Sequence, residues 1–235
     1  MQLNVLTIEC NNKIKQITSN DFRKMIIAIT DNMNQADKDK ISFHLTQEQF
    51  KDPTISKIPF VLYAFPRGKK FKIYTFNQDY KLLERITLEL KLYFYIQSQR
   101  FKIVNTTIKT KNIIPQLKDT TYKTKTPILL FTGNKRKWLD AVIINTKRED
   151  LDNILQVKIN ELIIENIRYQ MQQLFKYKEY KNFDNIKIKW DEFKLIRLTI
   201  RDKTEYGIVG QFRSNYSLPY FIGHRIGLGY GNIDV

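Results

Sequence analysis

The most constraining feature of this sequence is the order in which its hydrophobic residues change period along the chain. Alternation every second residue indicates a strand, and recurrence every three or four residues indicates a helix. Alternation begins at Leu3, and Ser19 is then a residue type that caps helices. The helical stripe that follows it consists of Phe22, Met25, Ile26, Ile29 and Met33. Two short aromatic and β-branched runs come next, at 58–65 and 70–76, and the turn composition between them predicts a hairpin.

The pattern then returns once more from helix to strand. Leu82, Leu83, Ile86 and Leu90 predict a second helix, and the stretches 93–96 and 101–108 have strand character. The order is therefore β-α-β-β-α-β, which is the split βαβ or ferredoxin-like unit. We predict that residues 1–113 form one such domain.

The second half of the chain predicts another unit of the same kind. Residues 114–126 are polar and basic around Pro115, which favours a basic linker, and 127–235 would form the second domain. Its predicted strands are 127–132 and 138–145, then 186–190 and 196–200 with basic outer faces. Thr146 and Glu149 fit a capping box before a long helix. The prediction is an α+β protein with two tandem ferredoxin-like, RRM-like domains.

Positive charge is both high and unevenly distributed. The net charge is +16, and residues 98–137 contain ten basic residues against one acid, Asp119. Such a concentration favours contact with a polyanion, although a solvated basic face is the alternative interpretation. The candidate RNA contacts in this stretch are Lys123, Lys125, Lys135, Arg136 and Lys137.

Several classes of protein are excluded or disfavoured by composition. Cys10 is the only cysteine, so an internal disulfide and a multi-cysteine metal site are both excluded. His44 and Glu48 lack a third ligand, so we expect no metal and no cofactor. No secretion signal is recognisable, and no stretch approaches the roughly 20 apolar residues of a membrane helix. We expect a cytoplasmic protein with no membrane partner.

Glycine is concentrated at the C-terminal end. Six of the eight glycines fall in the last twenty-nine residues. Glycine permits positive φ and close approach to a ligand, so successive backbone N–H groups can hold phosphate oxygens. A tight β-hairpin with glycine bends is the alternative. The candidate RNA-binding residues here are Arg213, Gly223, His224, Arg225, Gly227, Gly229, Tyr230 and Gly231.

The same C-terminal stretch resembles a known family. Residues 207–233 contain a G-x-F segment and then a polar stretch that ends in Leu-Pro. An apolar residue followed by glycine comes next, and the stretch closes with a hydrophobic-Gly-aromatic-Gly sequence. This combination is similar to the C-terminus of the CRISPR-associated endoribonucleases of the RAMP superfamily, which cut precursor CRISPR RNA. The family's loop usually carries more residues where His224, Arg225 and Ile226 stand. The resemblance implies CRISPR repeat RNA as the partner.

The resemblance also implies a metal-independent reaction. An RNA 2′-hydroxyl attacks the adjacent phosphate and leaves a 2′,3′-cyclic phosphate and a 5′-hydroxyl. Histidine suits proton transfer near neutral pH, and His44 lies close to where the family commonly carries its catalytic histidine. Lys51, Lys57 and Tyr63 are further catalytic candidates because they are near His44 in sequence. His224 is interpreted as a phosphate or base contact rather than the general base.

Two other functions stay open. The chain could be a non-catalytic RNA-binding subunit of a CRISPR effector complex, built from the same two domains and glycine-rich loop. It could instead be an unrelated basic two-domain RNA-binding protein. Effector-complex subunits and a second copy of the chain, as a homodimer, are the further partners left open.

Overall fold

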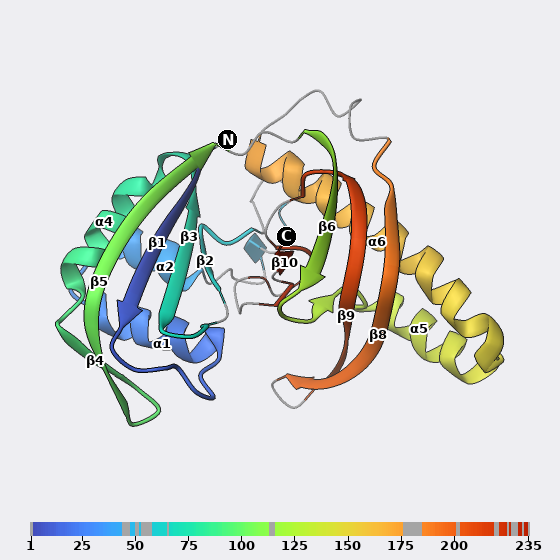
Figure 1. Cartoon of the computed structure of the whole chain (residues 1–235), viewed down its shortest axis with the longest axis horizontal. Helices are drawn as coiled ribbons and strands as arrows, with labels where there is room; N and C mark the ends of the chain where they lie inside the picture. Colours follow the sequence, from blue (N-terminus) through green and yellow to red (C-terminus); the bar gives the residue numbers. More distant parts are fainter. Residues whose placement is uncertain are drawn as a thin grey trace. The chain divides into compact units, whose positions relative to one another are not determined.

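Two units, each a β-sheet with helices packed against it, make up the computed structural model (Figure 1). They consist of Met1–Ile114 with Ile226–Gly229, and of Pro115–Arg225 with Tyr230–Val235. The structure describes residues 2–43, 48–49, 52, 58–64, 66–112, 116–175, 185–200, 203–218, 221–224, 226, 230–231 and 233–234.

The first unit is built on a five-stranded antiparallel sheet with the strand order β2-β3-β1-β5-β4. Its strands are β1 (Gln2–Cys10), β2 (Val61–Tyr63), β3 (Lys70–Phe76), β4 (Tyr93–Ile96) and β5 (Gln99–Asn112). The path β2-β3-β1-β5 is the split βαβ arrangement, which confirms the predicted ferredoxin-like unit. β4 extends it by one edge strand.

One face of this sheet is covered by helices. They are α1 (Ser19–Ile29), α2 (Gln35–Ser42) and α4 (Tyr80–Glu89), the last preceded by the 3₁₀ turn η1 (Asn77–Asp79). Phe22, Ile26, Leu83 and Ile86 of these helices are fully buried in one cluster with strand residues such as Phe71. Alternation places Phe71 and Ile73 in this core while Lys70 and Lys72 are exposed.

The N-cap of the first helix lies one residue earlier than predicted. The N-cap is Thr18, whose side chain accepts a hydrogen bond from the Asp21 N–H, and Asp21 completes a capping box. Ser19, predicted as the cap, is helical and its buried Oγ has no hydrogen-bond partner. The sequence analysis also missed α2, because only Asp37 and Ile41 of that helix are buried and no apolar stripe marks it.

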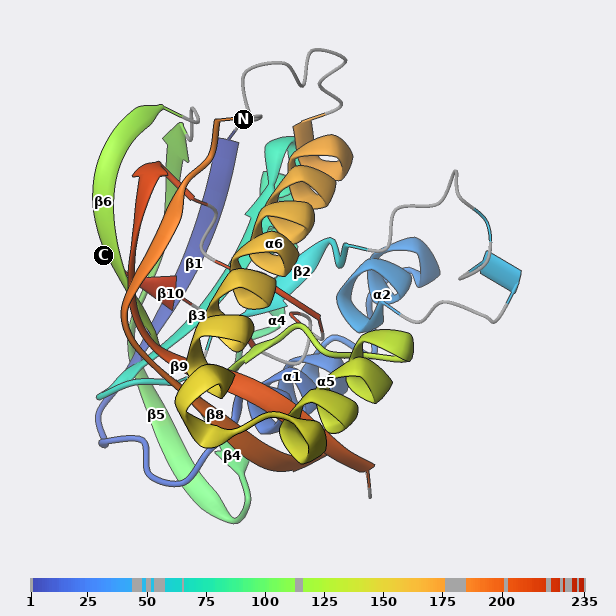
Figure 2. The ribbon, with the colours of Figure 1, turned by 90° about the vertical axis from the view of Figure 1, so that its right-hand side faces the viewer.

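The second unit has a sheet centred on one long strand. Its strands are β6 (Leu117–Thr124), β7 (Ile128–Leu129), β8 (Ile188–Ile200), β9 (Lys203–Tyr216) and β10 (Ile233–Asp234). β9 pairs with β8 along one edge and with β6 and β7 in succession along the other, and β10 pairs with β6. The helices α5 (Asn134–Asn145) and α6 (Arg148–Phe175) lie on one side of this sheet (Figure 2).

Three predictions for this unit were wrong in detail. The stretch 138–145 is helical within α5, because Leu139 and Trp138 pack onto the core from one helix face. The predicted linker contains β6, which has only Tyr122 buried and so shows no alternation, yet pairs with β9. The strands predicted at 186–190 and 196–200 are one strand, β8, with a bulge between Trp190 and Glu192. Residues 203–216, with no predicted element, form β9.

The cap of α1 provides a test of the local structure. Thr18→Ala should lower the free energy of unfolding by about 1 kcal/mol, because the Asp21 N–H loses its partner. Ser19→Ala should leave it nearly unchanged, because the Ser19 hydroxyl makes no hydrogen bond. Chemical denaturation of both variants measures the difference. Equal losses would contradict the assignment of Thr18 as the cap.

Candidate functional site

The C-terminal segment is attached to the edge of β7 by backbone hydrogen bonds. His224 N–H donates to the Leu129 carbonyl at 2.8 Å, and Gly231 N–H donates to the Pro127 carbonyl at 2.8 Å. Within the segment, Ile222 N–H donates to the Gly231 carbonyl at 2.8 Å. The segment thus turns back on itself against β7 before Ile233 joins β6. This geometry agrees with a glycine-bent turn at its two ends.

Packing explains two of the glycines. Gly231 has φ +71°, and a Cβ there would lie 1.7 Å from the Ile222 carbonyl oxygen. Gly223 has φ +98°, and a Cβ there would lie 2.7 Å from the Leu129 carbonyl oxygen. A larger residue at Gly223 would therefore push the segment away from β7, and one at Gly231 would separate the two arms of the turn. Gly227 and Gly229, together with Arg225, lie outside the described residues.

A polar pair on α6 holds the backbone at Gly223. Gly223 N–H donates to Asn166 Oδ1 at 2.7 Å, and Gln170 Nε2 donates to the same oxygen at 2.9 Å. Gln170 is buried among the apolar side chains of α6. The sequence analysis missed both residues, although two amides four positions apart on an apolar helix face are a readable signal.

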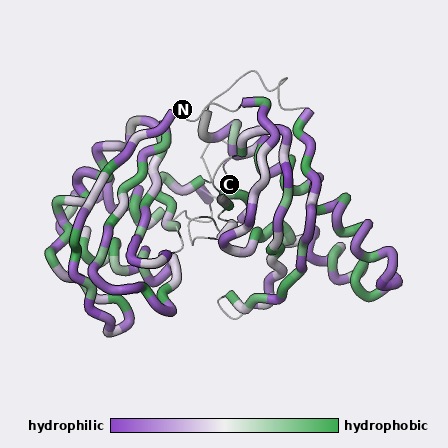
Figure 3. Tube along the Cα trace, viewed as in Figure 1, coloured by the Kyte–Doolittle hydropathy of each residue, from purple (hydrophilic) through white to green (hydrophobic). Residues whose placement is uncertain are grey.

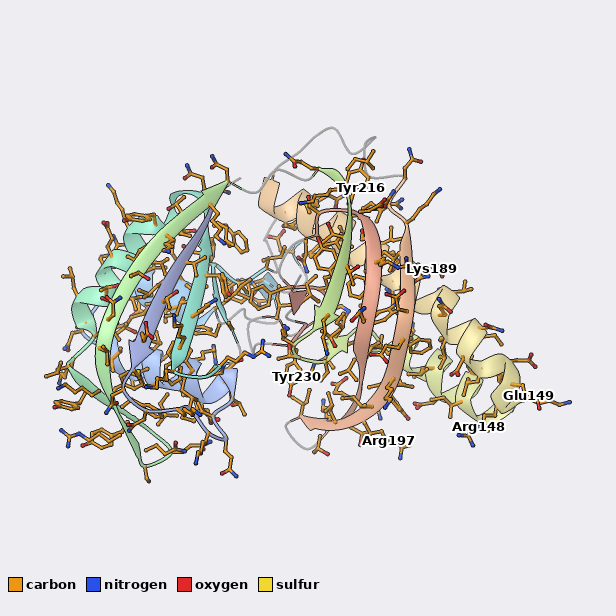
Figure 4. The ribbon with its side chains drawn as sticks, viewed as in Figure 1. Arg148, Glu149, Lys189, Arg197, Tyr216 and Tyr230 are labelled. Atoms are coloured by element: carbon orange, nitrogen blue, oxygen red, sulfur yellow. The ribbon has the colours of Figure 1, made fainter. Side chains whose placement is uncertain are left out.

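His224 is the exposed group that this anchoring presents. Its Nε2 lies 3.5 Å from Thr132 Oγ1, just before α5 begins. Tyr230, half-buried, lies near the other end of the turn (Figure 4). Both residues keep the accessible surface that their predicted RNA contacts need, and the contacts themselves stay predictions.

The five basic candidates between Lys123 and Lys137 do not form one surface. Lys123 is on β6 opposite Gln211, on the face turned away from the helices. Lys135 pairs with Glu165 at 2.7 Å, and Arg136 lies 3.8 Å from Asp140. Lys137 is exposed on α5, on the helix-covered side of the sheet, and Lys125 is half-exposed.

The face of the second sheet opposite the helices has mixed charge. Arg213 lies between Thr121 of β6 and Lys189 of β8, and it pairs with Asp191 at 2.8 Å. Lys189 projects from β8 (Figure 4). Arg213 is therefore placed beside another cation on an open sheet face, but its charge is already partly balanced.

The corresponding face of the first sheet is more strongly basic. Strand register puts Lys72, Thr7 and Thr107 in one row, and Tyr74, Val5 and Lys109 in the next. Lys70, Lys72, Lys102, Lys109 and Lys111 are exposed, and Glu9 is the acid among these rows. In Figure 3 the long strand β5 is largely hydrophilic. The lysines of β5 are visible in the sequence, but only the strand register places them on a common face.

Of the predicted catalytic residues, the structure describes only Tyr63. His44, Lys51 and Lys57 lie outside the described residues. Tyr63 is fully buried in the first core, where its hydroxyl donates to the Ile41 carbonyl at 3.2 Å and burial raises its pKa. A buried hydroxyl engaged in this way does not support a direct catalytic role.

Tyr63 instead stabilises the end of α2, close to His44 in the chain. The Ile41 carbonyl accepts from Tyr63, and the next carbonyl, that of Ser42, accepts from the Arg23 guanidinium. These are carbonyls of the last helical turn, which have no partner within the helix. Phe43 ends the helix in the left-handed region, immediately before His44. The contribution of Arg23 was not recognisable from sequence.

The described part of the chain contains neither a reactive thiol nor a cluster of metal ligands. Burial, reinforced by the charge of Glu9, raises the pKa of the Cys10 thiol to about 12, so it is not a nucleophile at neutral pH. The described residues contain no group of three or more His, Cys, Asp or Glu side chains that could hold a metal ion. No helix among them is long and apolar enough to span a membrane.

Comparison with known proteins identifies the fold. No family model and no curated protein matches the sequence. A solved structure described as a crystal structure of Cas6b is 16% identical, covers 99% of each chain and has a TM-score of 0.73. A CRISPR RNA processing endoribonuclease Cas6b is also 16% identical, covers 99% of this chain and 98% of its own, and has a TM-score of 0.61.

A third match extends the comparison to a protein described by its RNA binding. It is a RAMP protein binding different RNA substrates, 14% identical, which covers 100% of this chain and 99% of its own with a TM-score of 0.55. The matches run over the whole of both partners, so both units and their order along the chain are shared. The chain therefore has the tandem ferredoxin-like fold of Cas6 endoribonucleases and RAMP proteins.

Proposed function

We propose that this protein binds CRISPR repeat RNA and cleaves it as a precursor CRISPR RNA. The observation that carries the proposal is the full-length match, at a TM-score of 0.73, to a Cas6b structure. The net charge of +16 and the basic face of the first sheet support an RNA partner. The C-terminal features quoted from residues 207–233 support the same family independently of the fold.

In the proposed reaction a base removes the proton of the 2′-hydroxyl, and its oxygen bonds to the adjacent phosphorus. The bond from phosphorus to the 5′-oxygen breaks, and an acid protonates that oxygen. The products are a 2′,3′-cyclic phosphate and a 5′-hydroxyl. We assign proton transfer to His44 and charge stabilisation to Lys51 or Lys57. Tyr63 would act only by supporting the chain before His44.

Binding is assigned to the exposed groups around the C-terminal turn and on the sheet faces. His224 and Tyr230 would contact phosphate or base, and Gly223 and Gly231 would hold the turn in place. Arg225, Gly227 and Gly229 complete the proposed loop. Among the basic candidates, Lys123 and Lys137 are the better phosphate contacts, because Lys135, Arg136 and Arg213 have acidic partners.

A non-catalytic RNA-binding subunit is the second candidate function. The match to a RAMP protein binding different RNA substrates favours it. So does the burial of Tyr63, because it removes one of the four predicted catalytic groups. Both candidates require RNA binding, and they differ only in whether the bound RNA is cut.

The dependence of RNA affinity on salt tests the proposed phosphate contacts. Lys123→Gln with Lys137→Gln should reduce the slope of log affinity against log salt by about 1.4, since each contact to single-stranded RNA releases about 0.7 counterion. Lys135→Gln with Arg136→Gln is the matched control, and it should change the slope less because acids already neutralise both groups. Equal changes in the two double variants would show that total charge, and not these positions, determines binding.

Cleavage separates the two candidate functions. With excess EDTA, the wild-type protein should cut its repeat RNA once and leave a cyclic phosphate, and a 2′-deoxy substitution at the cut site should block the reaction. His44→Ala should cut at least about 100-fold more slowly with unchanged affinity. His224→Ala, the matched histidine control, should weaken binding while bound RNA is still cut. Tight binding by the wild-type protein without any cleavage would favour the non-catalytic subunit.

A further inference from the structure

The hairpin of β4 and β5 extends beyond the rest of the first sheet. Tyr93–Ile96 pairs with Gln99–Lys102, whereas β1 ends where Cys10 pairs with Ile103. The two turn residues, Gln97 and Ser98, both have positive φ, 49° and 64°, as tight two-residue hairpin turns require. The tip projects past β1 and β3 in both ribbon views (Figures 1 and 2).

One face of this hairpin is apolar and buried, and the other is aromatic and basic. Phe94 and Phe101 are buried and stacked at 5.5 Å between ring centroids, which fixes one face against the core. The opposite face therefore carries two cross-strand pairs, Tyr93 with Lys102 and Tyr95 with Arg100. Tyr95 is 61% exposed, although an aromatic ring of this size is usually at least half-buried.

Arg100 lies over one of these aromatic rings. Its guanidinium carbon is 3.9 Å from the centre of the Tyr93 ring. Stacking covers one side of the guanidinium plane and leaves the other side and its N–H edge available. Among the described residues, no acid pairs with Arg100 or Lys102. The positive charge of this face is therefore not neutralised locally.

The segment that follows β1 lies along the other edge of β5 and holds the hairpin in place. Asn11 exchanges two hydrogen bonds of 3.0 Å with the backbone of Lys102. Asn12 Nδ2 donates to the Arg100 carbonyl at 3.2 Å, and Gln99 Nε2 donates to the Lys15 carbonyl at 3.2 Å. A surface held in this way loses little conformational entropy when a ligand binds.

We propose that the exposed face of the β4–β5 hairpin is a binding site for single-stranded RNA. One unpaired base stacks on Tyr95, a neighbouring base stacks on the free side of Arg100, and a phosphate contacts Lys102. Further along β5, the exposed Lys109 and Lys111 lie on the same face and continue the basic path. This inference rests on the RNA-binding part of the proposed function, and it assigns unpaired nucleotides to the first unit.

The test uses a fluorescent 15-nucleotide oligo(U) RNA, which has no repeat sequence and no secondary structure. The variant is Tyr95→Ala with Arg100→Gln. Its matched control is Tyr80→Ala with Lys81→Gln, an exposed tyrosine and lysine on α4. Tyr80 follows the end of β3 that pairs with Leu3, at the opposite end of the sheet from the hairpin.

Fluorescence anisotropy should show the variant binding at least about tenfold more weakly than the wild type, because stacking is lost. The control should stay within about twofold. Tyr95→Phe alone should retain wild-type affinity, because the ring and its stacking surface remain. Lys102→Gln alone should reduce the salt slope by about 0.7, because Lys102 is the proposed phosphate contact. Circular dichroism checks that each variant is folded. We expect the fold to be preserved, because the substituted side chains are exposed.

The proposal is overturned if the wild type does not bind oligo(U), or if the variant and the control lose affinity equally. It is also overturned if the folded variant binds as tightly as the wild type. A hairpin effect on oligo(U) in a protein that neither prefers nor cuts repeat RNA would support this site and contradict the proposed function. Normal repeat cleavage with no hairpin effect would support the proposed function and contradict this site.

Discussion

In the part of the chain that the structure describes, each of the two sheets has helices on only one of its faces, and the arrangement of charge depends on this constraint. Because side chains alternate along a strand, burial of one face forces the next residue onto the other. Phe71 and Ile73 enter the first core, which leaves Lys70 and Lys72 outside. In the second unit Phe212 is buried and its neighbour Arg213 is exposed. The helix-free faces thus collect the basic residues that an RNA partner requires.

The C-terminal glycines illustrate how one residue type serves two purposes. Gly223 and Gly231 are needed by the fold, because a side chain at either position would meet a backbone carbonyl. Their close packing ties the segment to β7 and leaves His224 exposed beside Thr132. The hairpin interpretation and the binding interpretation of this segment are therefore compatible. A turn that is firmly attached at both ends is a suitable support for a loop that contacts RNA.

The likeness to Cas6 and RAMP structures rests on architecture, since sequence identity is 16% or less for the structures compared. At that distance the likeness concerns the fold, and it assigns no individual contact. The role of Tyr63 shows the difference. Its proximity in sequence to His44 suggested chemistry, but its hydroxyl supports the last turn of α2 from within the core. All three residues of β2 are buried, so its burial pattern does not show whether the Tyr63 hydroxyl reaches a site or supports the fold, and only the direction of the side chain distinguishes the two.

The sequence by itself determined the β-α-β-β-α-β order of the first unit, because hydrophobic periodicity is a local property of the chain. It also determined the basic excess and the glycine cluster. Only the tertiary structure decided that residues 117–124 are a strand, since their polar sequence gains order from pairing with β9. It likewise decided that Asn166 would hold Gly223 and that Arg100 would lie on Tyr93. These contacts join residues distant in sequence or on paired strands, and their geometry depends on register and packing that no local pattern encodes.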